Sequence, residues 1–286
     1  MQRIVDTHVH VWNFERADYV WLKGDTSILN RSYHIEELED QRKKAGVTDG
    51  VLVQAANNFE DTDWMLEVAE KAEWIKGVVG WLPLMHPSET ARALGEKYYG
   101  QKYFKGVRHL IHDEADPKWL LQTEVIESLQ TISDYHLPYD VVGVLPEHIE
   151  TALEVAQKSP SLRMVFDHLN QPPIPMAMGT KEKFGRWGEL MKEASKHENF
   201  FVKISGLGTA SKNIQWSEAD IKPYVEFVLE HFGEDHCFCG GDWPVSLLAG
   251  GYSHTWSIYY EVMDSLLNKD QRQKVYCDNA VAFYQL

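Results

Sequence analysis

The chain has 286 residues, 44% of them hydrophobic, so it can bury a large core within one domain. Asp and Glu outnumber Lys and Arg by 43 to 28, which gives a formal net charge of −15. This balance, without any Lys/Arg-rich run, argues against nucleic acid or an anionic membrane as the main partner. No stretch has the length and apolarity of a membrane span or of a secretion signal. Three cysteines do not suggest a disulfide framework, so we expect a reducing, cytoplasmic setting.

Short apolar segments alternate with helical patterns along the whole chain. Strands are predicted at 4–11, 50–54, 78–82, 106–111, 139–142, 163–167, 200–204 and 237–241. Helices are predicted at 35–45, 62–73, 88–98, 118–135, 146–157, 181–197, 218–231, 256–267 and 269–283. Strands separated by helices in this way indicate βα units and a parallel sheet.

Eight βα units in a chain of this length predict an α/β fold, a single-domain (β/α)8 (TIM) barrel over residues 1–286. An open doubly wound sheet is disfavoured because no Gly-rich phosphate turn follows the first strand. Three long segments follow strands, at 12–34, 170–180 and 205–217. In a barrel such loops build the active-site face, and loops of this length are often lids or pocket walls.

The first strand ends in a His-x-His motif. Alternation along the strand predicts that Asp6, His8 and His10 share one face. Two parallel imidazoles can bind a divalent metal or polarise a carbonyl oxygen, although an isolated His-x-His is also common on polar surface strands. The motif gains weight from Asp242, which ends the eighth strand beside two glycines, because the first and last strands of a closed barrel are neighbours. Asp242 can bind a metal, accept a proton from water, or cap the following turn.

Other polar side chains also follow strands. His168 ends the sixth strand, and Asp167 is expected to point outward if His168 points inward. Arg108, on the fourth strand, can grip a substrate or form a salt bridge inside the barrel. Lys203, on the seventh strand, needs water or an anion as a partner, and it shares a face with Ser205.

The remaining side chains of interest have mostly structural interpretations. Trp12, Trp216 and Trp243 follow strand ends, where an aromatic wall can cover the apolar face of a sugar. Cys237 and Cys239 have the opposite parity to Asp242 and are predicted to face the outer helices. Asp140 is expected nearer the bottom of the barrel, where stability is the commoner role. Six histidines are predicted on loops or helix surfaces, namely His109, His112, His136, His148, His197 and His231.

An ordered set of segments resembles one family. The opening Val5-Asp-Thr-His-Val-His-Val-Trp resembles the amidohydrolase superfamily. The segments Lys-Gly-Val-Arg-His at Lys105, Phe-Asp-His-Leu at Phe166, Val-Lys-Ile-Ser-Gly-Leu at Val202 and Phe-Cys-Gly-Gly-Asp-Trp-Pro at Phe238 resemble its amidohydrolase 2 branch. This branch includes sugar-acid and dicarboxylate lactonases. The Gly-Asp-Trp-Pro-Val-Ser-Leu-Leu segment is especially similar to L-fuconolactone and L-rhamnonolactone hydrolases, and the resemblance covers nearly the whole chain.

The resemblance implies hydrolysis of a small cyclic ester. It implies that His8, His10 and His168 surround the carbonyl oxygen, that Asp242 is the general base, and that Arg108 contacts substrate. We further expect Lys203, Trp12 and Trp243 at the substrate. His8, His10 and Asp242, with His168 as a further ligand, form the expected site for one Zn-like divalent ion. Binuclear relatives carry a bridging Lys on the fourth strand, where this chain has Arg108, so the expected site is mononuclear or metal-free.

Three alternatives stay open at this point. One is a 2-pyrone-4,6-dicarboxylate lactonase, and another is a metal-dependent decarboxylase or hydratase that acts on an unsaturated dicarboxylate. The third is a non-catalytic barrel that binds a sugar acid. The expected partner in the main interpretation is a small lactone or sugar acid, and a homo-oligomer is compatible with the sequence.

Overall fold

The computed structural model describes residues 2–174 and 184–286, and within them eight parallel strands form one barrel. The strands are β1 (Val5–Val9), β2 (Asp49–Val53), β3 (Ile75–Gly80), β4 (Phe104–His109), β5 (Tyr139–Val141), β6 (Met164–Phe166), β7 (Phe200–Ile204) and β8 (Cys237–Cys239). They lie in chain order, each paired in parallel with the next. The predicted (β/α)8 barrel is therefore confirmed, and the strands fall within a few residues of their predicted positions.

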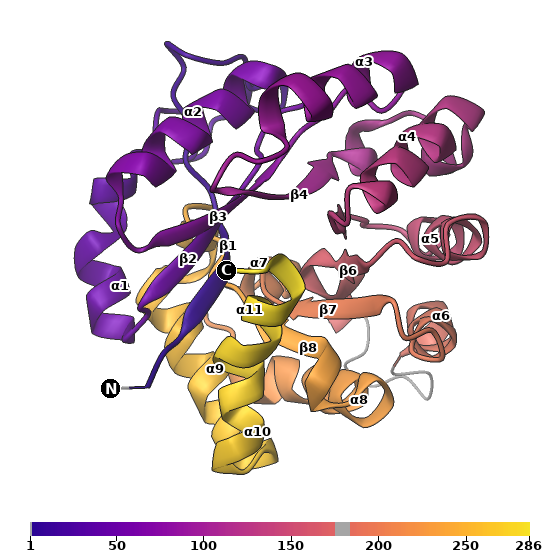
Figure 1. Ribbon diagram of the computed structural model, residues 1–286. Helices are drawn as coiled ribbons and strands as arrows, with labels where there is room; N and C mark the ends of the chain where they lie inside the picture. The colour runs from indigo at the N-terminus through magenta and orange to yellow at the C-terminus, as the bar shows by residue number, and fades with distance from the viewer. Residues whose placement is uncertain (1, 175–183) are drawn as a thin grey trace.

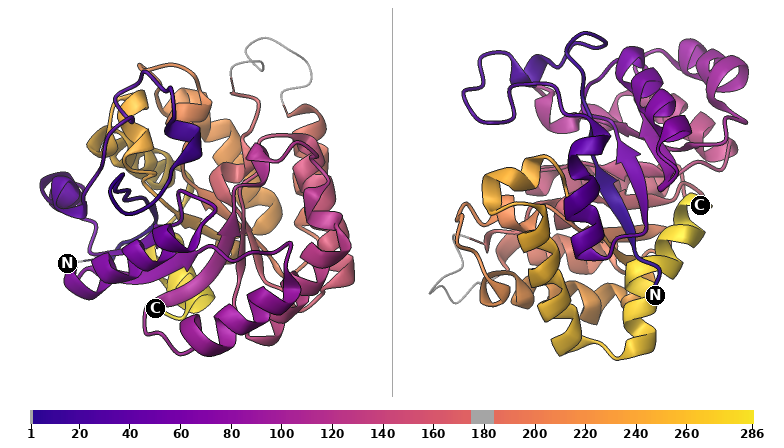
Figure 2. Two further views of the ribbon diagram at one scale, coloured as in Figure 1. Left: turned by 90° about the horizontal axis from the view of Figure 1, so that it is seen from above. Right: turned by 90° about the vertical axis from the view of Figure 1, so that its left-hand side faces the viewer.

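Most helices surround the strands on the outside, and the last one lies across one end of the barrel (Figures 1 and 2). They are α1 (Glu39–Ala45), α2 (Phe59–Lys71), α3 (Pro87–Ala93), α4 (Thr123–Asp134), α5 (Pro146–Lys158), α6 (Gly185–Ala194), α7 (Leu207–Ala210), α8 (Glu218–Phe232), α9 (Tyr252–Leu266), α10 (Lys269–Gln273) and α11 (Asn279–Tyr284). The short α7 lies in a segment predicted as a loop. The first residues of the helix predicted at 181–197, and most of the loop predicted at 170–180, lie outside the described residues. None of the helices in the described ranges is long and apolar enough to cross a membrane.

Strands β1 and β8 meet at the seam that closes the barrel. The backbone N–H of Asp242 donates to the carbonyl of His8 at 2.7 Å, and the N–H of His10 donates to the carbonyl of Trp243 at 2.7 Å. The backbones are so close here that a Cβ on Gly240 would lie 2.5 Å from the Cβ of His8. The residues after β8 therefore lie directly beside the His-x-His motif, as the barrel topology predicts.

Apolar side chains fill the lower part of the barrel. Val5, Val51, Val79 and Phe238 pack there against α11 through a cluster that includes Phe283. Helix α11, drawn in yellow in Figure 1, lies near β1 and β8, and its Tyr284 hydroxyl donates to Asp140. Asp140 thus lies toward the bottom, as expected. Cys237 and Cys239 belong to the separate core between the strands and the outer helices, as their parity predicts.

The prediction that Asp6 shares a face with His8 is wrong. The register of β1 against β2 shifts between Asp6 and Val9, which reverses the alternation at that point. Val5 and His8 consequently both point into the barrel. The carboxylate of Asp6 accepts hydrogen bonds from the backbone N–H groups of His8 and Gly241 and from the hydroxyl of Tyr252 on α9. Asp6 therefore supports the seam from the outside and does not enter the site.

Candidate active site at the carboxyl ends of the strands

A cavity of about 310 Å³ opens at the carboxyl end of the barrel. Its lining combines aromatic, apolar and polar side chains: His10, Trp12, Trp21, Ala55, Arg108, Leu110, His112, Asp113, Val142, Val144, His168, Gln171, Gly206, Thr209, Asp242 and Val245. A larger hollow of about 590 Å³ lies outside the barrel between α1 and α2, where Arg42 is already paired with Glu39. The smaller cavity is the candidate site because it lies at the carboxyl ends of the strands and brings His10, His168 and Asp242 together in its lining.

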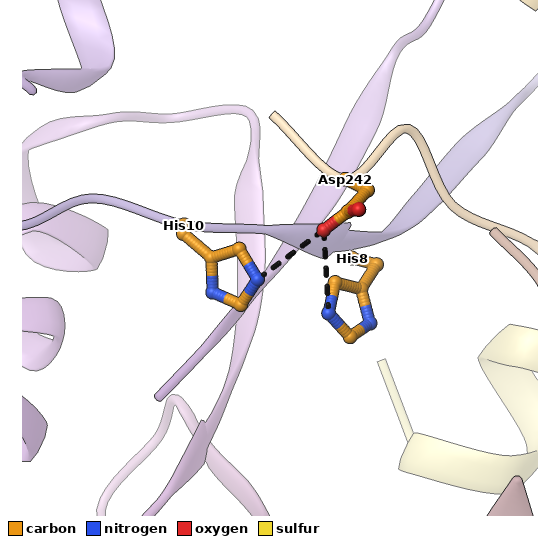
Figure 3. Close-up of side chains that lie close together, drawn as sticks. All are labelled: His8, His10 and Asp242. Carbon is orange, nitrogen blue, oxygen red and sulfur yellow. Dashed lines mark ion pairs between the residues drawn. The ribbon is translucent and has the colours of Figure 1, made fainter. Parts of the chain in front are cut away.

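His8, His10 and Asp242 form the centre of the site (Figure 3). The Oδ1 atom of Asp242 lies 3.5 Å from Nε2 of His10 and 3.9 Å from Nε2 of His8. The Nδ1 atom of His10 lies 2.7 Å from the carbonyl oxygen of Val53, to which it can only donate. In the neutral ring Nε2 of His10 therefore carries a lone pair, and this atom faces a carboxylate oxygen. Two acceptors at this separation attract a shared cation, either a proton or a metal ion.

His168 is held at the site by an unusual turn. His168, Leu169, Asn170 and Gln171 all have φ near +50°, in the left-handed region that side chains rarely adopt. The hydroxyl oxygen of Ser205 lies 3.3 Å from the backbone nitrogen of His168 and 2.9 Å from its Nδ1. The hydroxyl accepts from the backbone N–H group, and when it also donates to Nδ1 the neutral ring carries its proton on Nε2. Gly206 adjoins both His168 and Asp242, and a Cβ there would lie 2.5 Å from Nδ1 of His168.

The same turn overturns the prediction that Asp167 points outward. Asp167 is fully buried, and its carboxylate pairs with Arg108 at 2.9 Å and with Lys203 at 2.9 Å. Strand β6 ends at Phe166, so strict alternation no longer applies to Asp167 and His168. Both side chains consequently reach the interior of the barrel, with Asp167 beneath His8.

Arg108 and Lys203 occupy different levels of the barrel. Arg108 lines the cavity but is only 2% exposed, and it donates to Asp167 and to the carbonyl of Gln54. Lys203 is enclosed completely, with its Nζ 2.5 Å from Asp140 and 2.9 Å from Asp167. It does not line the cavity. The predicted need of Lys203 for an anion is met by two aspartates.

Burial sets the protonation states of the site. It lowers the pKa of His168, and it lowers the pKa of His8 well below the usual range for histidine. Both rings are therefore neutral near pH 7. Burial alone would raise the pKa of Asp167, but the charges of Lys203 and Arg108 help to hold it well below its usual range, so Asp167 is ionised.

One wall of the cavity is aromatic. Trp12 and Trp21 meet edge to face with ring centroids 5.4 Å apart, and the indole N–H of Trp21 donates to the carbonyl of Ala55. Trp243 and Trp216 do not line the cavity. Trp243 packs against Tyr33, and Trp216 donates to the carbonyl of Ala249.

Sequence reasoning did not single out several lining residues as parts of a site. Trp21, His112, Asp113 and Gln171 are contributed by loops, whose geometry periodicity does not describe. The signal available for Trp21 was its place in the long segment at 12–34 together with the aromatic residues around it.

Two histidines predicted as surface residues are buried. His109 is 6% exposed, accepts a hydrogen bond from the indole of Trp81, and lies 2.7 Å from Glu114. His148 is 2% exposed, and its Nδ1 accepts from the backbone N–H of Val144. His109 ends β4 and stacks on Trp119 with ring centroids 4.0 Å apart, and His148 lies in the first turn of α5.

Comparison with known proteins identifies the family. Residues 5–286 match the amidohydrolase family. The chain belongs to this family. The amidohydrolase described here is 32% identical to the L-fucono-1,5-lactonase of Burkholderia ambifaria, over 99% of this chain and 95% of that protein.

Solved structures of relatives share the fold. An amidohydrolase from Burkholderia multivorans with bound Zn superposes with a TM-score of 0.89 at 25% identity, covering 99% of each chain. A probable 2-pyrone-4,6-dicarboxylic acid hydrolase from Acinetobacter baumannii, at 15% identity and a TM-score of 0.75, covers 99% of this chain and 100% of its own. At that identity the second comparison supports the barrel fold alone.

The residues present fit a divalent metal. Candidate ligand atoms of His8, His10 and Asp242 all lie within 4.8 Å of one another, and all three side chains are buried. Two imidazole nitrogens and one carboxylate oxygen form a donor set that Zn²⁺ accepts, with a further position left for water or substrate. The lone pair on Nε2 of His10, fixed by Val53, satisfies the requirement that a ligating imidazole be deprotonated on the metal side.

Proposed function

We propose that this amidohydrolase hydrolyses a small, uncharged lactone of a sugar acid, such as an aldono-1,5-lactone. The observation that carries the proposal is the convergence of Asp242, His10 and His168 on one cavity walled by Trp12 and Trp21. Ester hydrolysis needs a base for water and hydrogen-bond donors for the oxyanion, and this cavity holds both. The curated relative with 32% identity is a lactonase, which supports the same reaction.

In the proposed reaction Asp242 accepts a proton from water while the water oxygen bonds to the lactone carbonyl carbon. His168 donates from Nε2 to the oxygen on which negative charge develops. The bond between the carbonyl carbon and the ring oxygen then breaks, and Asp242 returns the proton to that oxygen. A divalent metal held by His8, His10 and Asp242 would polarise the carbonyl and acidify the water when bound. The product is a hydroxy acid, which ionises and releases one proton near pH 7.

The charge of the cavity favours a neutral lactone over a dicarboxylate. Among the described lining residues Arg108 is the only Lys or Arg, and it already pairs with Asp167. The same lining includes the carboxylates of Asp113 and Asp242. A pyrone dicarboxylate or the substrate of a decarboxylase would bring two more negative charges without a free cation to receive them. The cavity volume of about 310 Å³ suits a single sugar ring.

The test is proton release from a panel of aldono-1,5-lactones, aldono-1,4-lactones and 2-pyrone-4,6-dicarboxylate. Asp242→Asn serves as the blank because lactones also hydrolyse spontaneously. We expect turnover of at least one aldonolactone by the wild type and a loss of at least 1,000-fold in Asp242→Asn, on the scale of removing a catalytic base. Turnover of the dicarboxylate alone, or equal rates in both proteins, would contradict the proposal.

A further inference from the structure

A layer of buried charged side chains lies directly beneath His8. Asp140, Asp167 and Lys203 have no exposed surface, and Arg108 is 2% exposed. The interior of such barrels is usually filled by branched apolar side chains. A buried ion cluster is seldom more stable than apolar packing of the same volume, so its presence beneath the site calls for a functional explanation.

The layer surrounds both nitrogens of His8. Nε2 of His8 lies 3.3 Å from the guanidinium of Arg108, which can only donate. Nδ1 lies 3.5 Å from the carboxylate of Asp167 and 3.4 Å from the ammonium of Lys203. Lys203 has a closer acceptor in Asp140, 2.5 Å from its Nζ, and Oδ1 of Asp167 receives no hydrogen bond among the described residues although Lys203 lies 2.9 Å from it. A proton on Nδ1 of His8 supplies the missing donor to Oδ1 of Asp167 and leaves the lone pair of Nε2 facing Arg108 and Asp242. This tautomer gives up the longer contact between Nδ1 and Lys203.

We propose that Asp167 is a positioning residue that fixes the tautomer and orientation of His8, and that Lys203 and Asp140 hold Asp167 in place. A carboxylate behind a ligating imidazole orients the ring and strengthens it as a ligand. Lys203 is then a positioning residue that acts on His8 through Asp167. Asp140 extends the layer to Tyr284 of α11, whose hydroxyl lies 2.9 Å from each carboxylate oxygen. This inference rests on the function proposed above, since it assigns the layer to the same site.

The four charged side chains of the layer pair with one another. Arg108 and Lys203 supply two positive charges, and Asp140 and Asp167 supply two negative charges when ionised. Burial raises the pKa of Asp140 to about 6, so its carboxyl is ionised at neutral pH. Removal of one member leaves an uncompensated charge in the barrel: Asp167→Asn leaves Arg108 without its carboxylate partner, while Lys203 stays paired with Asp140.

The first experiment measures the tautomer of His8 in the wild-type protein. Long-range ¹H–¹⁵N spectra of protein labelled with ¹⁵N-histidine show which ring nitrogen carries the proton, and His8→Gln identifies the signals of His8. We expect protonation at Nδ1. Protonation at Nε2 in the wild type would overturn the proposal, and this result needs neither a substrate nor a stable variant.

The second experiment measures the affinity for Zn²⁺ alone by competition with a chelator. We expect Asp167→Asn to bind Zn²⁺ 10- to 100-fold more weakly than the wild type, on the scale of losing the partner of a ligating histidine. Asp49→Asn is the matched control, because Asp49 is a buried aspartate at the opposite end of the barrel that pairs with Arg3. Equal Zn²⁺ affinity in Asp167→Asn and the wild type would overturn the proposal. Because neither readout uses a lactone, failure of the lactonase assignment is distinguishable from failure of this inference.

Discussion

Gly206 offers a direct test of whether the geometry around His168 and Asp242 governs turnover. The residue has φ +60°, and a Cβ placed on it would lie 2.5 Å from Nδ1 of His168 and 3.1 Å from Oδ2 of Asp242. Ordinary contacts of a Cβ begin at 3.4 Å, so Gly206→Ala forces the imidazole to move by about 1 Å. This movement also disrupts the hydrogen bond between the Ser205 hydroxyl and Nδ1 of His168.

Two separate costs follow from this substitution. An alanine in the left-handed region costs about 1–2 kcal/mol of folding free energy, and overpacking beside His168 adds about 1–3 kcal/mol. Displacement of a positioned group by about 1 Å lowers kcat by about 100-fold. We therefore expect a clear loss of stability together with a loss of kcat that stability alone does not explain.

The assay combines urea denaturation with proton release from the best aldonolactone at near-neutral pH. Gly46→Ala is the control, because Gly46 has φ +75° and no atom within 4 Å of the added Cβ. Gly46→Ala carries the free-energy cost of an alanine in the left-handed region but makes no new contact with a side chain. Its kcat should therefore equal that of the wild type. If Gly206→Ala keeps kcat within threefold of the wild type, or if both variants lose kcat alike, the proposed role of this contact is refuted.

Three further predictions concern the aromatic wall, a buried acid and the metal. Trp21→Ala should raise KM about 10-fold and leave kcat nearly unchanged, because loss of the ring contact with substrate costs about 1–1.5 kcal/mol. Steady-state kinetics measure both constants, and a change confined to kcat would contradict the prediction. Burial raises the pKa of Asp61 to about 6, so the folded protein retains a proton that the unfolded chain releases, and stability is lost as pH rises through that range. The free energy of unfolding of the wild type minus that of Asp61→Asn should therefore fall by about 2 kcal/mol between pH 4 and pH 7. Urea denaturation measures this difference, and a constant value would refute the prediction. Dialysis against a chelator should lower kcat at least tenfold, with recovery on addition of Zn²⁺, whereas full activity in the dialysed protein would show that the side chains act without a metal.

The sequence was sufficient to predict the barrel and the meeting of His8 and His10 with Asp242. The periodicities of strands and helices are local signals that can be read from the sequence. Closure of the barrel then brings the first and last strands together, independently of the conformation of the loops. His8 and His10 share a face because only one residue separates them after the irregularity in β1. Asp242 follows β8 at the seam and joins them there.

What the sequence could not predict depends on departures from regular geometry. Asp6 was assigned to the wrong face because a register shift in β1 has no signature in residue type. Asp167 was expected outside because the left-handed turn that begins at His168 brings two consecutive side chains to the interior. Lys203 was expected at the substrate because alternation gives the face of a side chain but not its depth in the barrel. Its partners Asp140 and Asp167 lie on other strands, so only the three-dimensional structure shows the pairing.

The seam between β1 and β8 has a consequence for how activity arises during folding. His8 lies in the first strand to be synthesised and His10 directly follows it, whereas Asp242 follows the last strand, more than 200 residues later in the chain. The backbone bonds of His8 and His10 to Asp242 and Trp243 are the same contacts that complete the cylinder. A chain with every helix formed but with the seam open holds its acid–base groups apart and cannot turn over substrate. Recovery of turnover after dilution from urea therefore reports on closure of the cylinder, and recovery of helical circular dichroism reports on the elements that precede it.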